Sequence, residues 1–158
     1  MEILDRPALP KGLRRTVVRL PIHLYRMRLG RLMGTRFLLL EHIGRKSGKR
    51  RQVVLEVIER SEDGFIVCSG FGARADWYRN VLAHPDVTIQ VADRRLDATA
   101  HPLDPAEGGE IMARYAPRHP KAAARLVRLM GFIVDGTADD YRRVGRELPF
   151  LRLSPKTT

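Results

Sequence analysis

Residues 36–58 read RFLLLEHIGRKSGKRRQVVLEVI, which is two apolar runs joined by a basic, glycine-containing loop. The run at 36–43 is typical of a buried strand, and apolar residues recur at every second position in 52–58, which predicts another strand. The loop between them, residues 44–51, contains five cations, two glycines and a serine. This stretch therefore predicts two β-strands that display a concentrated positive charge where they are joined.

The loop at 44–51 is chemically suited to hold an anion. Glycines allow a close backbone approach, and guanidinium groups pair bidentately with phosphate. Residues 1–51 contain 14 lysines and arginines against three acidic residues, so the net charge of +11 lies in the first third of the chain. Three residues separate the two glycines and a strand follows, which fits neither a Walker loop nor a dinucleotide-binding turn. The alternative is a solvated basic hairpin turn.

Length and composition bound the organisation of the chain. With 158 residues and 44% hydrophobic content, one compact domain with one core is expected. We divide it into a basic amphipathic helical segment at 1–34 and a barrel at 35–153. The single cysteine excludes an internal disulfide, no secretory leader is recognisable and no run is apolar enough to span a membrane, so a cytoplasmic location is expected.

The order of the remaining elements favours an α+β fold, namely a small antiparallel barrel with peripheral helices. Turn residues and alternating patterns predict two hairpins, and capping residues predict the helix starts. The expected elements are a hairpin over 51–69 with its turn at 61–64, a short helix at 76–83, a hairpin over 87–101, helices at 104–115 and 122–130, a helix capped by 137–140, and a strand at 150–153.

A second cluster follows the first hairpin and contains the only tryptophan. The residues Ser69-Gly70-Phe71-Gly72 leave a strand and lead into the DWYRN sequence at 76–80. Glycines after a strand indicate close ligand approach, and Trp77 and Asn80 share one face of the predicted helix. The alternative is that Trp77 fills the core.

Other chemistries lack support in the sequence. The five histidines have neither the spacing nor the cysteine partners of a zinc site, so no metal is predicted. Cys68 lies in an apolar strand, which favours a buried thiol over a nucleophile. No serine has an adjacent base in a nucleophile motif. Only Tyr25 and Phe37 are aromatic within residues 1–51, which disfavours specific nucleic-acid binding.

Taken together, GRKSG-x-x-R at 44–51, Ser69-Gly70, and DWYRN at 76–80 followed by AHP-x-V resemble the deazaflavin-dependent nitroreductase family of the split β-barrel flavin-binding superfamily. The resemblance covers roughly 35–153. It implies a split β-barrel that binds the deazaflavin coenzyme F420, which carries a phosphate and a glutamyl tail, and that catalyses two-electron reductions. FMN is the alternative coenzyme, because it offers a phosphate to the same loop.

The resemblance also implies a set of coenzyme-binding residues, with phosphate-binding cations, a supporting loop and positions that line the ring. They are Arg45, Lys46 and Arg51 for phosphate; Ser47 and Gly48 for the loop; and Val54, Leu55, Val67, Cys68, Ser69, Gly70, Trp77 and Asn80 for the ring. Tyr115 is the candidate catalytic residue, as a proton donor or as a group that orients the acceptor. Three departures from the family concern Val54, which replaces a proline, a short loop before Trp77, and a single tyrosine over the substrate.

The expected function is therefore an F420-dependent oxidoreductase that transfers a hydride between the reduced coenzyme and a hydrophobic conjugated, nitro or quinone-like acceptor. The alternatives are an FMN-binding split-barrel protein and a non-catalytic module for a coenzyme or an anionic surface. The resemblance implies a homodimer. The cationic, amphipathic composition of 12–33 fits either a helix packed on the barrel or peripheral contact with anionic membrane at the inner membrane face.

Overall fold

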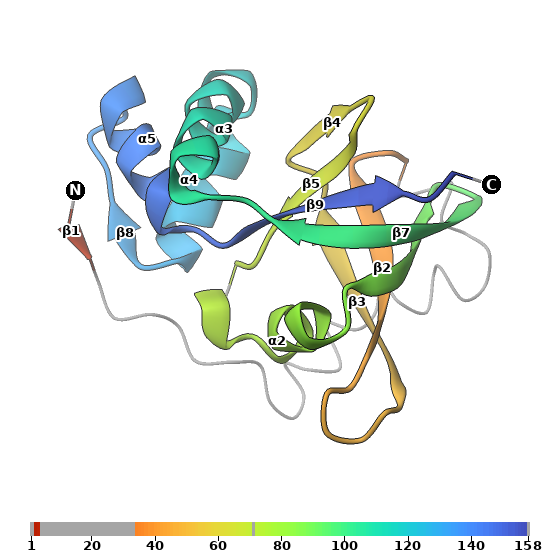
Figure 1. Ribbon diagram of the computed structural model, residues 1–158. Coiled ribbons are helices and arrows are strands. Elements are labelled where there is room, and N and C mark those ends of the chain that lie inside the picture. Colours follow the sequence, from red (N-terminus) through yellow and green to blue (C-terminus); the bar gives the residue numbers. More distant parts are fainter. Residues whose placement is uncertain (1, 4–33, 71, 158) are drawn as a thin grey trace.

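The computed structural model describes residues 2–3, 34–70 and 72–157, which form a curled antiparallel sheet with helices packed against it (Figure 1). The sheet runs in the order β3-β2-β6-β7-β9-β5-β4, and each neighbouring pair is antiparallel. Its strands are β2 (Phe37–Ile43), β3 (Arg50–Glu56), β4 (Glu59–Ser61), β5 (Gly64–Cys68), β6 (Asp86–Val91), β7 (Arg94–Pro102) and β9 (Phe150–Pro155).

The sheet curls because strands that are consecutive in the chain lie at its opposite edges. Only two residues separate β3 from β4, yet β3 forms one edge and β4 the other. The N–H of Val57 donates to Arg36 beside β2, whereas the N–H of Ile58 donates to Ile66 in β5. The two edges therefore approach each other at this connection but do not pair along their lengths. We call the unpaired line between the edge strand β3 and the opposite edge the seam. This arrangement confirms the predicted split barrel.

The predicted hairpin over 51–69 is only partly confirmed. The turn at 61–64 does reverse the chain, but the strand that pairs with β5 is the short β4. The longer β3 pairs with β2 instead, in a register that places His42 opposite Arg51. The alternating pattern predicted that both segments are strands. It did not predict the break between β3 and β4, or which edge of the sheet each strand joins.

The inside of the barrel is filled by apolar side chains and closed at one end by α2 (Asp76–Ala83). Leu38, Leu40 and Ile89 are fully buried there. Helix α2 contributes Trp77, Tyr78 and Val81 to the same core. The bounds of α2 match the prediction, since His84 and Pro85 end the helix as expected. A short 3-10 turn, η2 (Gly72–Arg74), leads into it.

A second core lies between the outer face of β5 and β9 and three helices, α3 (Pro105–Arg118), α4 (Pro120–Leu129) and α5 (Ala138–Glu147). Asp104 and Thr137 cap α3 and α5 through their side chains, as predicted. The predicted end of α3 near Tyr115 is wrong, because the helix continues to Arg118. Pro117 lies in its last turn, where the missing N–H removes only one helical hydrogen bond.

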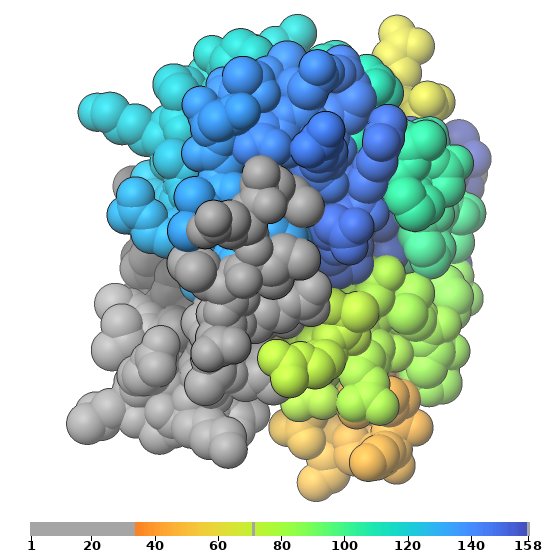
Figure 2. All heavy atoms as spheres, turned by 90° about the vertical axis from the view of Figure 1, so that its left-hand side faces the viewer, coloured from red at the N-terminus to blue at the C-terminus, as the bar shows by residue number. Residues whose placement is uncertain are grey.

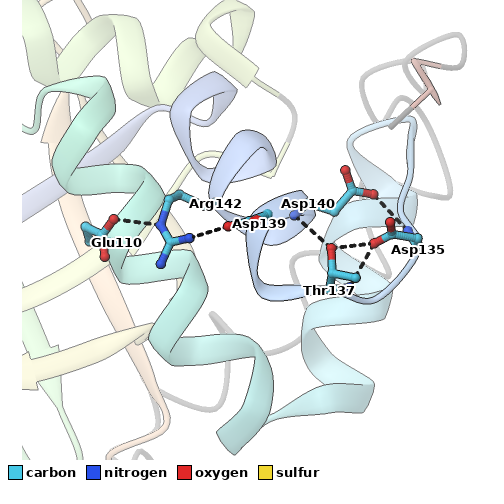
Figure 3. Close-up of polar contacts among 6 residues, drawn as sticks. All are labelled: Glu110, Asp135, Thr137, Asp139, Asp140 and Arg142. Atoms are coloured by element: carbon cyan, nitrogen blue, oxygen red, sulfur yellow. Dashed lines mark hydrogen bonds and ion pairs between the residues drawn. The ribbon is translucent and has the colours of Figure 1, made fainter.

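Helices α3 and α5 approach closely through glycines. A Cβ atom at Gly145 would collide with the carbonyl oxygen of Gly108, so only hydrogen fits there. Arg142 ties the pair together, because it donates to Glu110 of α3 at 2.7 Å and to Asp139 of α5 at 2.8 Å (Figure 3). Helices α3 and α5 are thus in close backbone contact and joined by an ion pair.

The loop before α5 is held by its own polar contacts (Figure 3). The backbone N–H of Asp135 donates to the Asp140 carboxylate, and the Thr137 hydroxyl donates to Asp135. Just before this loop, β8 (Phe132–Ile133) pairs with β1 (Glu2–Ile3) at the start of the chain. The two-residue strands β1 and β8 were not predicted.

The predicted amphipathic segment at 12–33 lies outside the described residues. No helix in the described part of the chain is both long enough and apolar enough to cross a membrane.

Candidate functional site

The basic loop forms a tight turn between β2 and β3, at the end of the molecule opposite the helical layer (Figures 1 and 2). Gly44 donates to the carbonyl of Lys49 and Gly48 donates to the carbonyl of Gly44, each at 2.8 Å. Gly48 has a φ of +68°, a conformation that L side chains rarely adopt. The hydroxyl of Ser47 accepts the N–H of Lys49 at 3.2 Å and stabilises the turn.

The loop is fastened to α2 through Arg45 and Asn80. The backbone N–H of Arg45 and its Nη1 both donate to Oδ1 of Asn80, at 3.1 and 2.8 Å. Nη2 of Arg45 also contacts Oδ1 of Asp76 at 3.2 Å. Arg45 was predicted to bind phosphate and Asn80 to line the ring. The structure brings the two together and pairs them with each other.

His42 lies behind Asn80 and completes this network. Its Nδ1 is 3.2 Å from Nδ2 of Asn80, and both side chains are about 95% buried, with exposures of 4% and 5%. Burial, and to a smaller extent the positive charge of Arg51, lower the pKa of His42 to about 4, and Asp76 acts in the opposite sense. His42 is therefore neutral at physiological pH.

The other cations of the loop are exposed. Lys46, Lys49, Arg50 and Arg51 form no hydrogen bond from their side chains and no ion pair with the residues that the structure describes. Arg51 lies opposite His42 in the ladder, so its side chain shares the face of the hairpin that meets α2. Arg50 points to the opposite face. Lys46 and Arg51 are thus both available to an anion beside the anchored Arg45.

The predicted ring-lining residues of β3 point to opposite faces of the sheet. Leu55 lies in the barrel core at 8% exposure, while Val54 is half-buried on the outer face. The N–H of Gly44 donates to Lys49 and that of Val57 donates to Arg36, which shows which residue pairs of the β2–β3 ladder are hydrogen-bonded. Such pairs alternate with non-hydrogen-bonded ones, and Val54 belongs to the latter. Its backbone N–H and C=O therefore point away from β2. No described strand pairs with that edge of β3, which faces the seam.

The predicted residues of β5 and the turn after it divide in the same way. Val67 is fully buried inside the barrel, and Cys68 packs in the second core, where burial raises the pKa of its thiol. The hydroxyl of Ser69 donates to Gly72 at 2.5 Å, and its N–H donates to Pro149. A Cβ atom on Gly70 would lie 3.1 Å from a methyl group of Leu129 in α4. Gly70 itself is half-exposed.

Trp77 packs in the barrel core with 9% of its surface exposed. Its ring meets that of Tyr78 edge-on, with 5.9 Å between centroids and 88° between planes. Trp77 thus fills the core at the end of the barrel that carries Asn80 and the anchored loop.

Tyr115, the predicted catalytic residue, lies on α3 rather than beside the loop. Its hydroxyl donates to Glu56 at the end of β3, at 2.8 Å, and the side chain is 3% exposed. Burial raises the pKa of Tyr115, and the hydrogen bond to Glu56 raises it further. Glu56 also lies 3.6 Å from Arg36, and His119 stacks at 5.1 Å from the Tyr115 ring.

Two features of the site escaped the sequence analysis. His42 was not singled out, although its position two residues after Leu40 on the inward face of the strand predicts burial. The Arg45–Asn80 contact joins residues 35 positions apart, and no local pattern signals it. Among the described residues, no group of three or more histidine, cysteine, aspartate or glutamate side chains is arranged to hold a metal ion.

A family model for F420H(2)-dependent quinone reductases matches residues 17–137, which is most of the chain and includes the loop, Trp77 and Asn80. The chain belongs to the F420H(2)-dependent quinone reductase family. The predicted kinship with F420-dependent enzymes of split-barrel fold is thereby confirmed.

Individual proteins that are similar to this chain have descriptions that name the same reduced coenzyme. A Mycobacterium tuberculosis (strain ATCC 25618 / H37Rv) protein, Rv3178, whose name places it provisionally among F420H(2)-dependent quinone reductases, is 43% identical over 61 residues, covering 37% of this chain and 51% of that protein. The chain thus matches about half the length of this curated relative. The structure of an F420-H2 dependent reductase (FDR-A) aligns with a TM-score of 0.52 and 24% identity over 75% of this chain and 94% of that one.

A structure described as a domain-swapped dimer aligns with a TM-score of 0.54 and 21% identity, over 85% of this chain and 99% of that chain. At these identities the structural neighbours support the fold alone.

Proposed function

We propose that this family member is an F420-dependent oxidoreductase that transfers a hydride between the reduced coenzyme and a hydrophobic conjugated, nitro or quinone-like acceptor. The family description names the reduced coenzyme and a quinone. In the quinone reaction the acceptor gains a hydride and one proton, and the coenzyme is oxidised. The deazaflavin supplies the hydride chemistry, so the protein has to position two reactants and exclude water.

The observation that carries this proposal is the anchored loop with exposed cations. Arg45 is held by Asn80 and Asp76, which fixes the turn, while Lys46 and Arg51 have no ion-pair partner in the described structure. A rigid turn with unpaired cations and flanking glycines fits a phosphate-bearing coenzyme. Lys46 and Arg51 would hold the phosphate, with Ser47 and Gly48 shaping the turn around it.

The seam beside β3 is the proposed place for the ring. The outward-facing N–H and C=O of Val54 and the half-exposed Gly70 offer backbone contacts there. Leu55, Val67 and Cys68 would support the ring from within the two cores, without direct side-chain contact. Trp77 and Asn80 would border the phosphate end through α2.

Tyr115 remains our candidate for donating the proton or orienting the acceptor. Its phenol stays protonated in neutral solution, because both burial and the Glu56 hydrogen bond raise its pKa. A Tyr115→Phe variant should lower kcat while leaving the dissociation constant of the coenzyme unchanged. If kcat is also unchanged, Tyr115 has only a packing role.

The phosphate assignment is tested by Lys46→Ala and Arg51→Ala. Each should weaken coenzyme binding roughly tenfold to hundredfold, since one charge-assisted contact contributes about 1.5–3 kcal/mol. Titration with purified F420, followed by its own fluorescence, measures the affinity. Lys121→Ala and Arg143→Ala remove the same charge from exposed helical positions and should bind as wild type. Equal affinities in all four variants would reject the assignment.

FMN binding is the first alternative, and competition between FMN and F420 in the same titration separates the two. A non-catalytic coenzyme module is the second. It would bind F420 with the same dependence on Lys46 and Arg51, but it would not oxidise the reduced coenzyme when a water-soluble quinone is added.

We further propose a homodimer, for which the domain-swapped neighbour offers precedent at the level of fold. Light scattering at micromolar concentration should report twice the 18.0 kDa mass of the chain. A monomer mass across the concentration range would exclude it.

A further inference from the structure

We propose that His42 is a positioning residue: as a neutral imidazole protonated on Nε2, it orients the Asn80 amide, which in turn holds the coenzyme-binding loop. This inference rests on the proposed function, because it assigns the loop its task of gripping the coenzyme phosphate.

Hydrogen-bond chemistry fixes the orientation of Asn80. The backbone N–H and the guanidinium of Arg45 are donors only, so the Asn80 atom that faces them at 3.1 and 2.8 Å must be the amide oxygen. Two donors thus converge on one oxygen. The NH2 group of Asn80 is then turned toward His42.

The same logic fixes the state of His42. An NH2 group only donates, so Nδ1 of His42, 3.2 Å away, must offer a lone pair. In a neutral imidazole the proton then resides on Nε2. An imidazolium would bring two donors together, and the amide could relieve this only by turning its oxygen away from Arg45.

The charged groups around the imidazole favour the neutral form. Arg51 of β3 lies opposite His42 in the ladder, and Arg45 lies beyond Asn80. Asp76 of α2 is the acidic group that opposes them, and it is itself paired with Arg45. Burial and Arg51 together lower the pKa of His42 to about 4, so the network stays intact through neutral and mildly acidic pH.

His42 does not touch the coenzyme in this account. It is 4% exposed, and its Nδ1 faces the side-chain amide of Asn80. A change in coenzyme affinity on altering His42 reaches the loop either through Asn80 or through its cross-strand neighbour Arg51, and only the route through Asn80 requires a hydrogen-bond acceptor at position 42. Asn80 itself does not offer so clean a test, since it was predicted to contact the coenzyme.

The test compares two replacements of His42 by titration with F420. His42→Gln keeps an acceptor for Asn80, whereas His42→Leu removes it at similar volume. We expect His42→Leu to weaken binding about threefold to tenfold, the factor for one neutral hydrogen bond, and His42→Gln to stay within about twofold. Wild-type affinity in His42→Leu, or equal losses in both variants, would overturn the positioning role.

Lys46→Ala separates this failure from failure of the proposed function. If Lys46→Ala binds weakly while His42→Leu binds as wild type, only the positioning role is lost. If Lys46→Ala and Arg51→Ala both bind as wild type, the phosphate assignment fails first.

A measurement on the unaltered protein does not depend on whether a variant folds. Nitrogen-15 NMR of the His42 imidazole should show an unprotonated Nδ1 and a protonated Nε2 from pH 8 down to about 5. A proton on Nδ1 at pH 7 would overturn the inference.

Discussion

At the residue scale, the site depends on which donors and acceptors already have partners. Arg45 was predicted to bind phosphate directly; it contacts Asn80 and Asp76, and we therefore propose Lys46 and Arg51 as the phosphate ligands. The sequence identified the cations as a group because glycines and charge density are local properties. It could not separate anchoring from binding cations, because that distinction depends on a contact across 35 positions.

The titration of His42 predicts how stability varies with pH. The unfolded imidazole takes up a proton as the pH falls through 6.5, while the folded one resists until about 4. The free energy of unfolding is therefore fully retained above 6.5 and declines between 6.5 and 4, by up to roughly 3 kcal/mol. Urea unfolding across this range should show the decline in wild type and a smaller one in His42→Gln. Parallel curves for the two proteins would contradict the assignment.

At the scale of elements, local signals fixed starts and ends well. Asp104, Thr137 and the His84-Pro85 pair marked the predicted boundaries because capping and proline effects act within one turn. The division into β3 and β4 was not predictable, since it is set by which sheet edge each segment joins. The extension of α3 to Arg118 adds exposed residues, and it was missed because a proline in the last turn removes only one helical hydrogen bond and need not end the helix.

The α3–α5 contact gives a prediction at this scale. Gly145→Ala places a methyl group against the Gly108 carbonyl and against Cβ of Met112, so the helices must separate. We expect a loss of about 1–3 kcal/mol in the free energy of unfolding, measured in urea, with F420 affinity of the folded protein unchanged. Arg143→Ala, on the exposed face of α5, should change stability by less than about 0.5 kcal/mol. A Gly145→Ala protein as stable as wild type would show that this crossing tolerates a wider spacing.

At the scale of the whole molecule, the helical layer and the basic hairpin lie apart. The helical layer covers one end, and the basic hairpin projects beneath α2 at the other, as both views show (Figures 1 and 2). The positive charge of residues 1–51 is thus in part displayed at a tip fastened by four side chains, Arg45, Asn80, Asp76 and His42. The fold class was predicted from the order of strands and helices. The seam was not, because it depends on β3 pairing at one edge of the sheet and β4 at the other.

The alternative of an anionic surface as partner is tested at this scale by sedimentation with vesicles. Membrane contact through 12–33 predicts binding to anionic vesicles, none to zwitterionic ones, and no change in Lys46→Ala/Arg51→Ala. Binding that disappears in this double variant would assign the contact to the hairpin instead. Absence of sedimentation with either vesicle at low salt would remove the membrane proposal.

The central claim is that the anchored hairpin holds the coenzyme phosphate. A crystal structure of the protein with bound F420 tests it most directly, through the position of the phosphorus atom. Our account predicts phosphate oxygens within hydrogen-bonding distance of Lys46 and Arg51, with Arg45 still on Asn80. A phosphate lodged elsewhere, with Lys46 and Arg51 extended into solvent, would contradict it.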